Sequence, residues 1–293
     1  MNLDQLRALL AVVDHGTFDA AARILHVTPS AVSQRIKALE RHTGRVLVER
    51  SAPCRPTETG EVLVRAARQM ALIEHDVRAT LGEGGQAGVD LPVAVNADSL
   101  ATWFEPVLGA AAGWSDVRLQ LEVEDEEYSA DLLRRGSVVA AVTADPTPVA
   151  GCRTEILGAM RYLPVAAPGL AQRHTHGGRP DWATMPVLRF NTKDELQHVV
   201  LRGLGVAADP PVSQVPSSES FVAAARAGLG WAMVPEAQLG DDLETGRLVL
   251  LRQRMHRDVP LYWQAWTLET PKIARLSEAV HEAARRLRPV RRR

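Results

Sequence analysis

Hydrophobic residues recur at helical spacing through most of the first 80 positions of the chain. Residues 2–15 carry an apolar stripe typical of an amphipathic helix. A second short helix is predicted after Thr17, whose hydroxyl can cap it. A third is predicted from Pro29, because Thr28 can accept a first-turn amide and proline suits the first helical position. The three apolar faces together predict a small helical core.

A short wing and then a long helix are predicted next. Residues 46–53 read as two short strands, and a helix with acids in its first turn follows Thr57. Apolar residues along this helix alternate in steps of three and four, which indicates either a heptad seam for a partner helix or a stripe that packs on its own domain. The stripe comprises Leu63, Ala66, Met70, Ile73 and Val77. Four glycines within residues 82–88 then indicate a hinge.

From residue 89 onward, short β-branched runs alternate with helical segments. Their order is strand, helix, strand, helix, strand, which predicts a parallel sheet covered by helices. A second group of elements occupies about residues 164–266, and a last helix from Pro271 returns to the first group. The sequence therefore predicts an α/β fold overall, with a mainly α head and two α/β lobes. Ligands of such sheets lie at the carboxyl ends of the strands.

Composition narrows this picture. The 293 residues, 46% of them hydrophobic, are enough for more than one core. No apolar run approaches the roughly 20 residues that span a bilayer, and the first residues read as helix rather than as a signal peptide. We therefore expect a cytoplasmic protein without a membrane partner. The two cysteines fall in different predicted domains and no metal-ligand cluster occurs, so no disulfide, metal or cofactor is expected.

Charge is unevenly distributed, although the formal net charge is only −1. Six Lys or Arg residues stand between positions 35 and 55 against Glu40 and Glu49, whereas residues 122–131 are strongly acidic. The outer face of the third predicted helix carries hydroxyls, an amide and cations, which suit base edges and phosphates in a DNA major groove. These residues are Ser30, Ser33, Gln34, Lys37 and Arg41. A merely solvated helix face is the plain alternative.

The segment AARILHVTPSAVSQRIKALERHTGRVLVER resembles the DNA-binding domain of LysR-type transcription regulators. The resemblance implies a winged helix-turn-helix whose helix TPSAVSQRIK enters the major groove of double-stranded DNA. It also implies a linker helix that forms a homodimer on a pseudo-palindromic operator. A tetramer and RNA polymerase as a partner stay open. The expected DNA-contacting residues are Thr28, Ser30, Ala31, Ser33, Gln34, Arg35, Lys37 and Arg50.

Three segments place polar groups where a cleft between the lobes is expected. Residues 96–103 and 215–220 are strand ends that run into helix starts, where N–H groups and hydroxyls suit a carboxylate. The third is acidic and comprises residues 124–127 together with Asp145, which suit a cationic group. The combination favours a zwitterion with a cationic side chain, such as lysine or arginine.

Segments such as NADSLATW, LGAMRYLPVA and PSSESFVAAARAG resemble the ArgP/LysG branch of the LysR-type regulators. Members of this branch respond to basic amino acids and control genes such as a lysine or arginine exporter, and their effector domain resembles a small type 2 periplasmic binding protein. The residues carried over as cleft-lining are Asp98, Ser99, Asp125, Glu126, Thr143, Asp145, Ser217, Ser218 and Glu219. As simpler alternatives, Asp98 caps a helix, and Glu126 and Glu127 complement the N-terminus of one.

We therefore expect a winged helix-turn-helix at 1–57, a linker helix and hinge at 58–88, and an effector domain at 89–293. Its lobes are expected at about 89–163 with 267–293, and at about 164–266. No nucleophile elbow, metalloprotease pair or phosphate loop occurs, which argues against an enzyme. The expected function is a regulator that senses lysine, arginine or histidine. The alternatives are a regulator of this type for another small metabolite and an amino-acid-binding module without a regulatory role.

Overall fold

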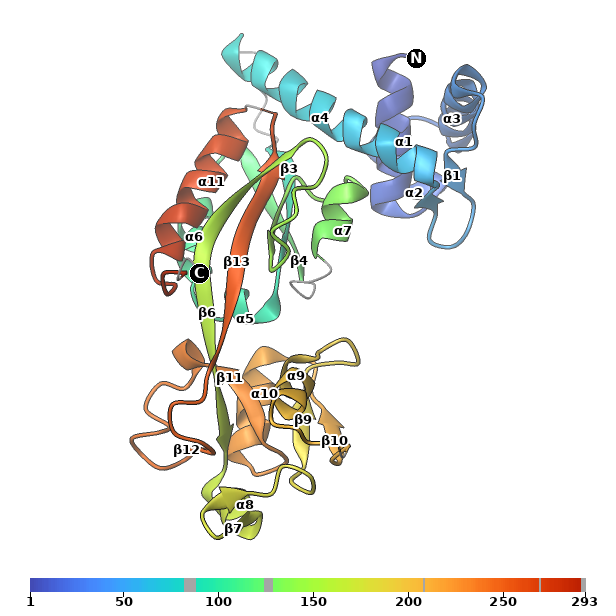
Figure 1. Cartoon of the computed structure of the whole chain (residues 1–293). Coiled ribbons are helices and arrows are strands. Elements are labelled where there is room, and N and C mark those ends of the chain that lie inside the picture. The colour runs from blue at the N-terminus through green and yellow to red at the C-terminus, as the bar shows by residue number, and fades with distance from the viewer. Residues whose placement is uncertain (82–87, 124–128, 208, 269, 291–293) are drawn as a thin grey trace.

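The computed structural model describes residues 1–81, 88–123, 129–207, 209–268 and 270–290. Figure 1 shows a helical head, a long helix that leaves it, and two lobes joined by a pair of crossing strands. The predicted α/β fold with a mainly α head is confirmed.

The head has three helices within residues 1–57. They are α1 (Leu3–His15), α2 (Phe18–Ile24) and α3 (Pro29–Thr43). Both predicted caps are present, since the Thr17 hydroxyl accepts from the Ala20 N–H at 3.1 Å and the Thr28 hydroxyl accepts from the Ala31 N–H at 3.2 Å. The buried faces of the helices form one hydrophobic cluster, as the periodicity predicts.

A short wing connects the head to the long helix. Its antiparallel strands are β1 (Val48–Glu49) and β2 (Arg55–Pro56). The long helix α4 (Glu58–Thr80) begins at Thr57, whose hydroxyl accepts from the Gly60 N–H at 3.1 Å. A Cβ at residue 60 would lie 2.0 Å from the Leu47 carbonyl oxygen, so α4 can start against the wing only because this residue is glycine.

The apolar stripe of α4 has two parts. Leu63 is half-buried and packs against the core of the head, so the own-domain alternative holds for this end. Met70, Ile73 and Val77 are 37%, 45% and 52% exposed. The far end of α4 therefore presents apolar side chains that nothing in the described chain covers.

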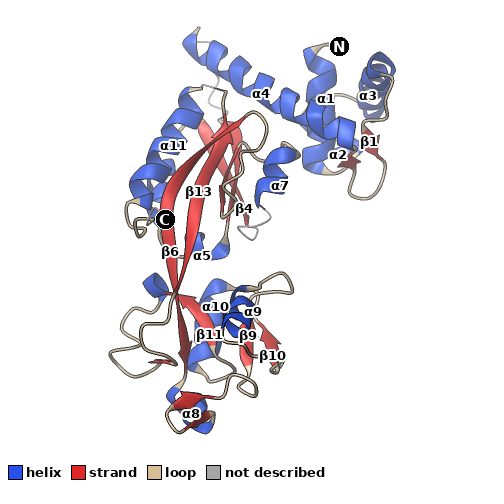
Figure 2. Ribbon diagram, viewed as in Figure 1, coloured by secondary structure: helices blue, strands red, loops and turns tan. Residues whose placement is uncertain are grey.

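The lobes share a seven-stranded sheet within the described residues, in the order β11-β6-β13-β5-β3-β4 with β12 also beside β6. The strands are β3 (Val89–Val95), β4 (Val117–Val123), β5 (Ala140–Thr143), β6 (Cys152–Ala166), β11 (Ala232–Pro235), β12 (Val249–Leu250) and β13 (Arg257–Trp266). As predicted, β3 pairs in parallel with β4 and β5. Figure 2 shows α6 (Glu105–Ala111) and α11 (Pro271–Ala284) on one side of this part and α7 (Ser129–Arg134) on the other.

Strands β6 and β13 cross between the lobes (Figure 1). Their antiparallel register shifts between Leu261 and Tyr262, and from Tyr262 onward β13 also pairs with β5 of the first lobe. Gly158 lies at this crossing with φ of 148°, and a Cβ there would come within 2.6 Å of the Leu287 Cβ. The sequence predicts that the chain crosses twice between the lobes. It does not predict that β6 begins before residue 164. The strand pairing shows that β6 and β13 each have one part in either lobe.

The second lobe adds short elements around β11. They are α8 (Pro168–Arg173), β7 (Thr175–His176), β8 (Arg179–Pro180), β9 (Val187–Arg189), α9 (Leu196–Gly203), β10 (Val212–Gln214), α10 (Ser218–Arg226) and the single-turn helix η1 (Glu236–Gln238). The short helix α5 (Ala97–Leu100) faces this lobe from the first lobe. Strand β9 pairs in parallel with β10 and makes one parallel bridge to Trp231, next to β11. The amino-terminal ends of α9 and α10 thus follow strands of this lobe, as the sequence predicts.

Asp242 is fully buried in the second lobe and makes the stability of the protein depend on pH. Burial alone would raise the pKa of Asp242, but hydrogen bonds from Arg226 at 2.7 Å and Arg247 at 2.6 Å outweigh it and lower the pKa. The stabilisation is therefore complete above the unfolded pKa of about 3.9 and is lost as pH falls through the lower folded pKa. We expect Asp242→Asn to lower the melting temperature clearly at pH 6 and by a smaller amount near pH 3, which lies below the unfolded pKa. The exposed Asp209→Asn should do so at neither pH, and an equal loss at both for Asp242→Asn would contradict the assignment.

The first lobe docks on α4 and the head through charged side chains. The Arg68 guanidinium on α4, with 10% of the side chain exposed, donates to the carbonyl oxygens of Gly136 and Ser137 after α7 and to the Asp14 carboxylate of α1. Further along α4, Asp76 pairs with the buried Lys272 of α11. Arg68 thus joins the head, the long helix and the first lobe at one point.

Within the described residues, no helix is long and apolar enough to cross a membrane, and no cluster of three or more potential metal ligands occurs. Cys54 and Cys152 are both buried free thiols, one in the head and one at the start of β6.

Candidate functional site

The outer face of α3 is exposed along its length. Val32, Ile36 and Leu39 are buried, whereas the polar residues between them face solvent or are half-buried. The exposed side chains are those of Thr28, Ser30, Gln34, Lys37 and Arg41, and the half-buried ones are those of Ala31, Ser33 and Arg35. The structure thus brings most of the predicted DNA-contacting residues onto one surface.

Two of these residues also have structural contacts. The Thr28 hydroxyl caps α3 and lies 3.1 Å from the Ser30 hydroxyl. The Arg35 guanidinium lies 3.7 Å from the Asp4 carboxylate of α1, so it turns toward the head rather than directly outward. Both stay predictions as DNA contacts, and the geometry favours their neighbours Gln34 and Lys37.

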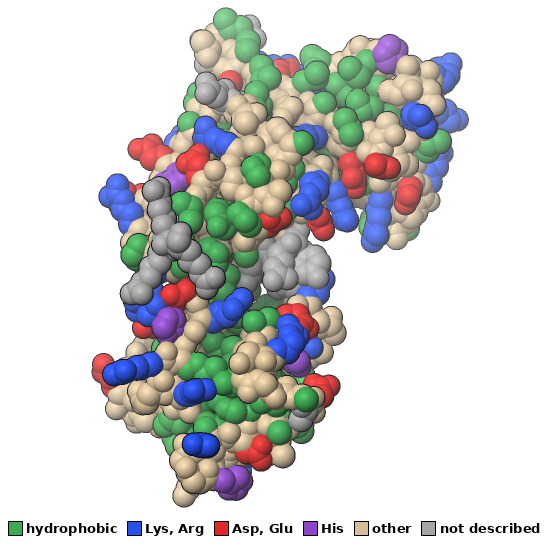
Figure 3. All heavy atoms as spheres, in the orientation of Figure 1, with side chains coloured by type: hydrophobic (Ala, Val, Ile, Leu, Met, Phe, Trp, Pro, Cys, Tyr) green, Lys and Arg blue, Asp and Glu red, His purple; other side chains and the backbone are tan. Residues whose placement is uncertain are grey.

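A hollow of about 570 Å³ lies between α3 and the start of the wing. It is lined by Gln34, Lys37, Glu40, Arg41, Gly44, Arg45 and Val46. Arg50 stands on the wing with its guanidinium 5.2 Å from the Phe18 ring centre, which orients it beside α2. Figure 3 shows Lys and Arg side chains gathered along this outer edge of the head. An exposed helix flanked by cations is the arrangement that duplex DNA requires.

A second candidate site is a cavity of about 310 Å³ between the lobes, beside the crossing strands. Its first-lobe wall contains Asn96, Ala97, Asp98 and Ala144, and the strands contribute Tyr162, Arg257, Asp258, Val259 and Pro260. The second-lobe wall contains Phe190, Lys193, Asp194, Glu195, Leu196, Gln197, Val199, Phe221 and Met233. The volume suits one small molecule with an apolar portion and polar ends.

The Asp98 carboxylate joins the two lobes at this cavity. It accepts from the Ser218 hydroxyl of α10 at 2.7 Å and from the Tyr162 hydroxyl of β6 at 3.0 Å. The Gln238 amide in turn donates to the Ser218 oxygen at 2.6 Å. The capping alternative for Asp98 is not supported, because the N-cap of α5 is Asn96. Asp98 and Ser218 are thus the two predicted residues that the structure brings together.

Of the predicted residues that the structure describes, Asp98 lies in the cavity lining and Ser218 is bonded to it, and the others are not part of that lining. The buried Ser99 hydroxyl accepts from the Trp103 indole at 2.9 Å, and the buried Thr143 hydroxyl accepts from the Asp145 N–H at 3.1 Å. The Asp145 carboxylate accepts from the Thr147 N–H at 2.8 Å. Ser217 caps α10 and Glu219 is exposed in its first turn. Asp125, Glu126 and Glu127 lie outside the described residues. The ligand roles of this group stay predictions, and the geometry does not favour Ser99.

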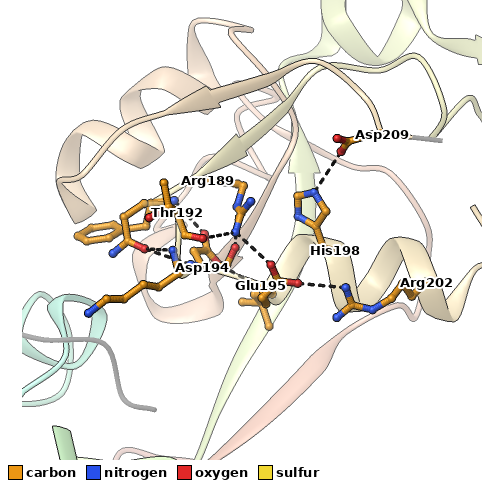
Figure 4. A network of polar contacts seen from close by, with 11 residues as sticks. Arg189, Thr192, Asp194, Glu195, His198, Arg202 and Asp209 are labelled. Atoms are coloured by element: carbon orange, nitrogen blue, oxygen red, sulfur yellow. Dashed lines mark hydrogen bonds and ion pairs between the residues drawn. The ribbon is translucent and has the colours of Figure 1, made fainter. Parts of the chain in front are cut away.

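A loop of the second lobe supplies lining residues that the sequence reasoning missed. Figure 4 shows Arg189 at its centre, donating to the carbonyl oxygens of Asp194 at 2.7 Å and Thr192 at 2.8 Å and to the Glu195 carboxylate at 3.2 Å. A hydrogen bond from Arg202 lowers the pKa of Glu195 below its usual range. The signal was present, because FNTKDEL follows a buried strand and precedes a helix, as the other two segments do.

Two family models match this chain, one for each part. The model described as bacterial regulatory helix-turn-helix protein, LysR family, matches residues 3–61, and the LysR substrate binding domain matches residues 84–285. The chain belongs to the LysR family. It is therefore a transcription regulator that binds DNA through its helix-turn-helix, not an enzyme, and the resemblance on which the expectation rested is confirmed.

Several LysR-family proteins are similar over nearly the whole length. The lysine export transcriptional regulatory protein LysG of Corynebacterium efficiens is 52% identical over 97% of this chain and 98% of its own. The structure of full-length LysG from Corynebacterium glutamicum with bound effector Arg has a TM-score of 0.81 and 48% identity, covering 99% of this chain and 100% of that one. ArgP of Mycobacterium tuberculosis has a TM-score of 0.86 and 47% identity, with 98% of each chain covered. The assignment to the ArgP/LysG branch is thus confirmed.

Proposed function

We propose that this LysR-family regulator senses a basic amino acid in the cavity between its lobes and controls genes such as a basic-amino-acid exporter. The observation that carries the proposal is the Asp98 carboxylate, which lines the cavity and accepts hydrogen bonds from Ser218 of the second lobe and Tyr162 of β6. Two similarities support it: relatives at about half identity are named for lysine export, and a similar structure holds arginine as effector.

The chemistry of the cavity suits a basic amino acid. Asp98 offers a partner for a cationic group, and Arg257 and Lys193 offer positive charge for a carboxylate. Phe190, Phe221 and Met233 form an apolar wall for an aliphatic stem. A ligand that binds Asp98 either competes with or reinforces the hydrogen bond between Ser218 of the second lobe and Asp98 of the first. Binding therefore changes the free-energy difference between arrangements in which the two lobes are closer together or further apart.

The DNA-binding half of the proposal uses the outer face of α3 and the wing. Ser30, Ser33, Gln34 and Lys37 read bases or phosphates in the major groove, and Arg50 contacts the backbone. The exposed stripe of α4 pairs with that of a second copy. A homodimer then presents two heads to half-sites separated by about 34 Å or a multiple of one helical turn. A tetramer would add further heads.

The proposal is tested by calorimetric titration of the full chain with each of the twenty amino acids. We expect heat with lysine, arginine or histidine, and binding of the protein to fragments of promoters next to exporter genes at low salt. Heat with none of the three would contradict the effector class. Absence of any promoter binding would contradict the regulatory role.

Replacing Asp98 by Asn should raise the Kd for arginine and lysine at least about tenfold, because a charge-assisted contact to the effector is lost while the shape is kept. The matched control is Asp181→Asn, since Asp181 lies outside the cavity lining and accepts hydrogen bonds within its own loop, from the Ala183 N–H and the Thr184 hydroxyl. Calorimetry on both variants measures the difference. Equal affinities for wild type and Asp98→Asn would remove Asp98 from the site.

Two head variants separate base reading from backbone contact. Gln34→Ala should relax sequence preference, costing about 1–3 kcal/mol on the preferred operator and little on random DNA. Arg50→Ala should weaken all duplexes alike and reduce the salt dependence of binding. Fluorescence anisotropy at several salt concentrations measures both. Identical effects from the two variants would show that the readers are misassigned.

A further inference from the structure

Gln197 of α9 is a buried polar side chain in the cavity wall. It is 1% exposed, and its Oε1 atom is buried without a hydrogen-bond partner among the residues that the structure describes. The residue shares the inward face of α9 with Val200 and Leu201, which are both in the hydrophobic core. A leucine would satisfy this position as far as packing is concerned.

An unmet buried acceptor is costly, and most buried polar groups in proteins are bonded. A glutamine at a core position therefore indicates a partner that enters from outside the chain. Since Gln197 also lines the cavity, that partner is either an ordered water or a donor group of the effector.

We propose that the Gln197 amide oxygen accepts from the side-chain cation of the effector and so selects basic over neutral amino acids. This inference rests on the proposed function. A basic amino acid carries two donor-rich cationic groups. Asp194 and Glu195 also line the second-lobe wall, but their carboxylates already accept hydrogen bonds from neighbouring groups of that lobe. We therefore assign the two cations to Asp98 of the first lobe and to the unmet Gln197 oxygen of the second. The apolar wall of Phe190, Phe221 and Met233 belongs to the lobe of Gln197. An aliphatic stem on this wall brings its terminal cation to Gln197 and leaves the α-ammonium to Asp98.

A neutral acceptor suits this task. An amide oxygen can bond to an ammonium or a guanidinium, so it does not itself distinguish lysine from arginine. An amino acid of the same length without a terminal cation leaves the Gln197 oxygen unmet, and rejection of such analogues is how buried polar groups produce specificity. Norleucine, which is lysine with the ε-ammonium replaced by hydrogen, is the matched probe.

The experiment compares wild type, Gln197→Leu and Gln197→Glu by calorimetry with lysine, arginine and norleucine. We expect Gln197→Leu to raise the Kd for lysine and arginine about tenfold or more and to leave norleucine within twofold of wild type. Gln197→Glu restores an acceptor and should recover most of the lost affinity. Without effector, the melting temperature of Gln197→Leu should equal or exceed that of wild type, because an unmet buried group is removed.

The outcomes separate this inference from the proposed function. If wild type binds lysine or arginine and Gln197→Leu binds them equally well, the partner of the Gln197 amide is a water molecule. The inference about Gln197 is then overturned, while the proposed function stands. An equal loss for norleucine would also overturn it, because Gln197 would then contact a group common to all amino acids. If wild type binds no basic amino acid, both statements fail together.

Discussion

Replacing Arg68 by methionine is expected to lower the free energy of unfolding by about 3–5 kcal/mol. The guanidinium is mostly buried and serves two carbonyl oxygens, of Gly136 and Ser137, and the Asp14 carboxylate. Methionine keeps the stem but leaves all three acceptors without their donor. Burial already raises the pKa of Asp14, since the attraction of Arg68 offsets it only in part. Denaturant unfolding measures the loss, and an NMR titration should show the pKa of Asp14 rising further.

The matched control for Arg68 is Arg78→Met on the same helix. Arg78 also pairs with an acid, Glu74, at 2.7 Å, but its side chain is 58% exposed and the pair is a surface contact one turn apart. We expect a loss of about 0.5 kcal/mol or less. Similar losses for the two variants would show that the contact among the head, α4 and the first lobe is not maintained in solution.

Local signals made the head and the parallel part of the sheet predictable. Thr17, Thr28 and Pro29 mark helix starts through bonds within a few residues, and these bonds are present. The alternation of β-branched and helical runs predicted β3, β4 and β5 as parallel strands in the same way. Such features need no knowledge of distant parts of the chain.

Features that depend on distant contacts were not predictable. The start of β6 at Cys152 is stabilised by pairing with β13 more than 100 positions later, so its own sequence carries a weak signal. The strand-end rule found the correct edge of the sheet but not the direction of each side chain. Asp98 turns to the cavity and Ser99 turns to Trp103, although the two are adjacent. Gln197 was missed because a polar residue on a helix reads as solvated until its burial is known.

Replacing both Ile73 and Val77 by Glu is expected to convert the proposed homodimer into monomers and to weaken operator binding at least about a hundredfold. These apolar side chains are 45% and 52% exposed at the far end of α4, and paired helices would bury them. Two acids in that interface repel their copies, and a single head loses the gain from simultaneous binding of two half-sites. Analytical ultracentrifugation and operator titration measure the two effects.

The control for this pair is Leu229→Glu, an equally apolar position in the second lobe that is 49% exposed. Because this residue follows α10 in the second lobe, whereas α4 packs on the head and the first lobe, it should change neither the mass in solution nor the affinity for a single half-site. The double variant should keep that half-site affinity, since the α3 surface is untouched, and lose only the advantage of the full operator. A double variant that still sediments as a dimer would show that the stripe on α4 is not the pairing surface.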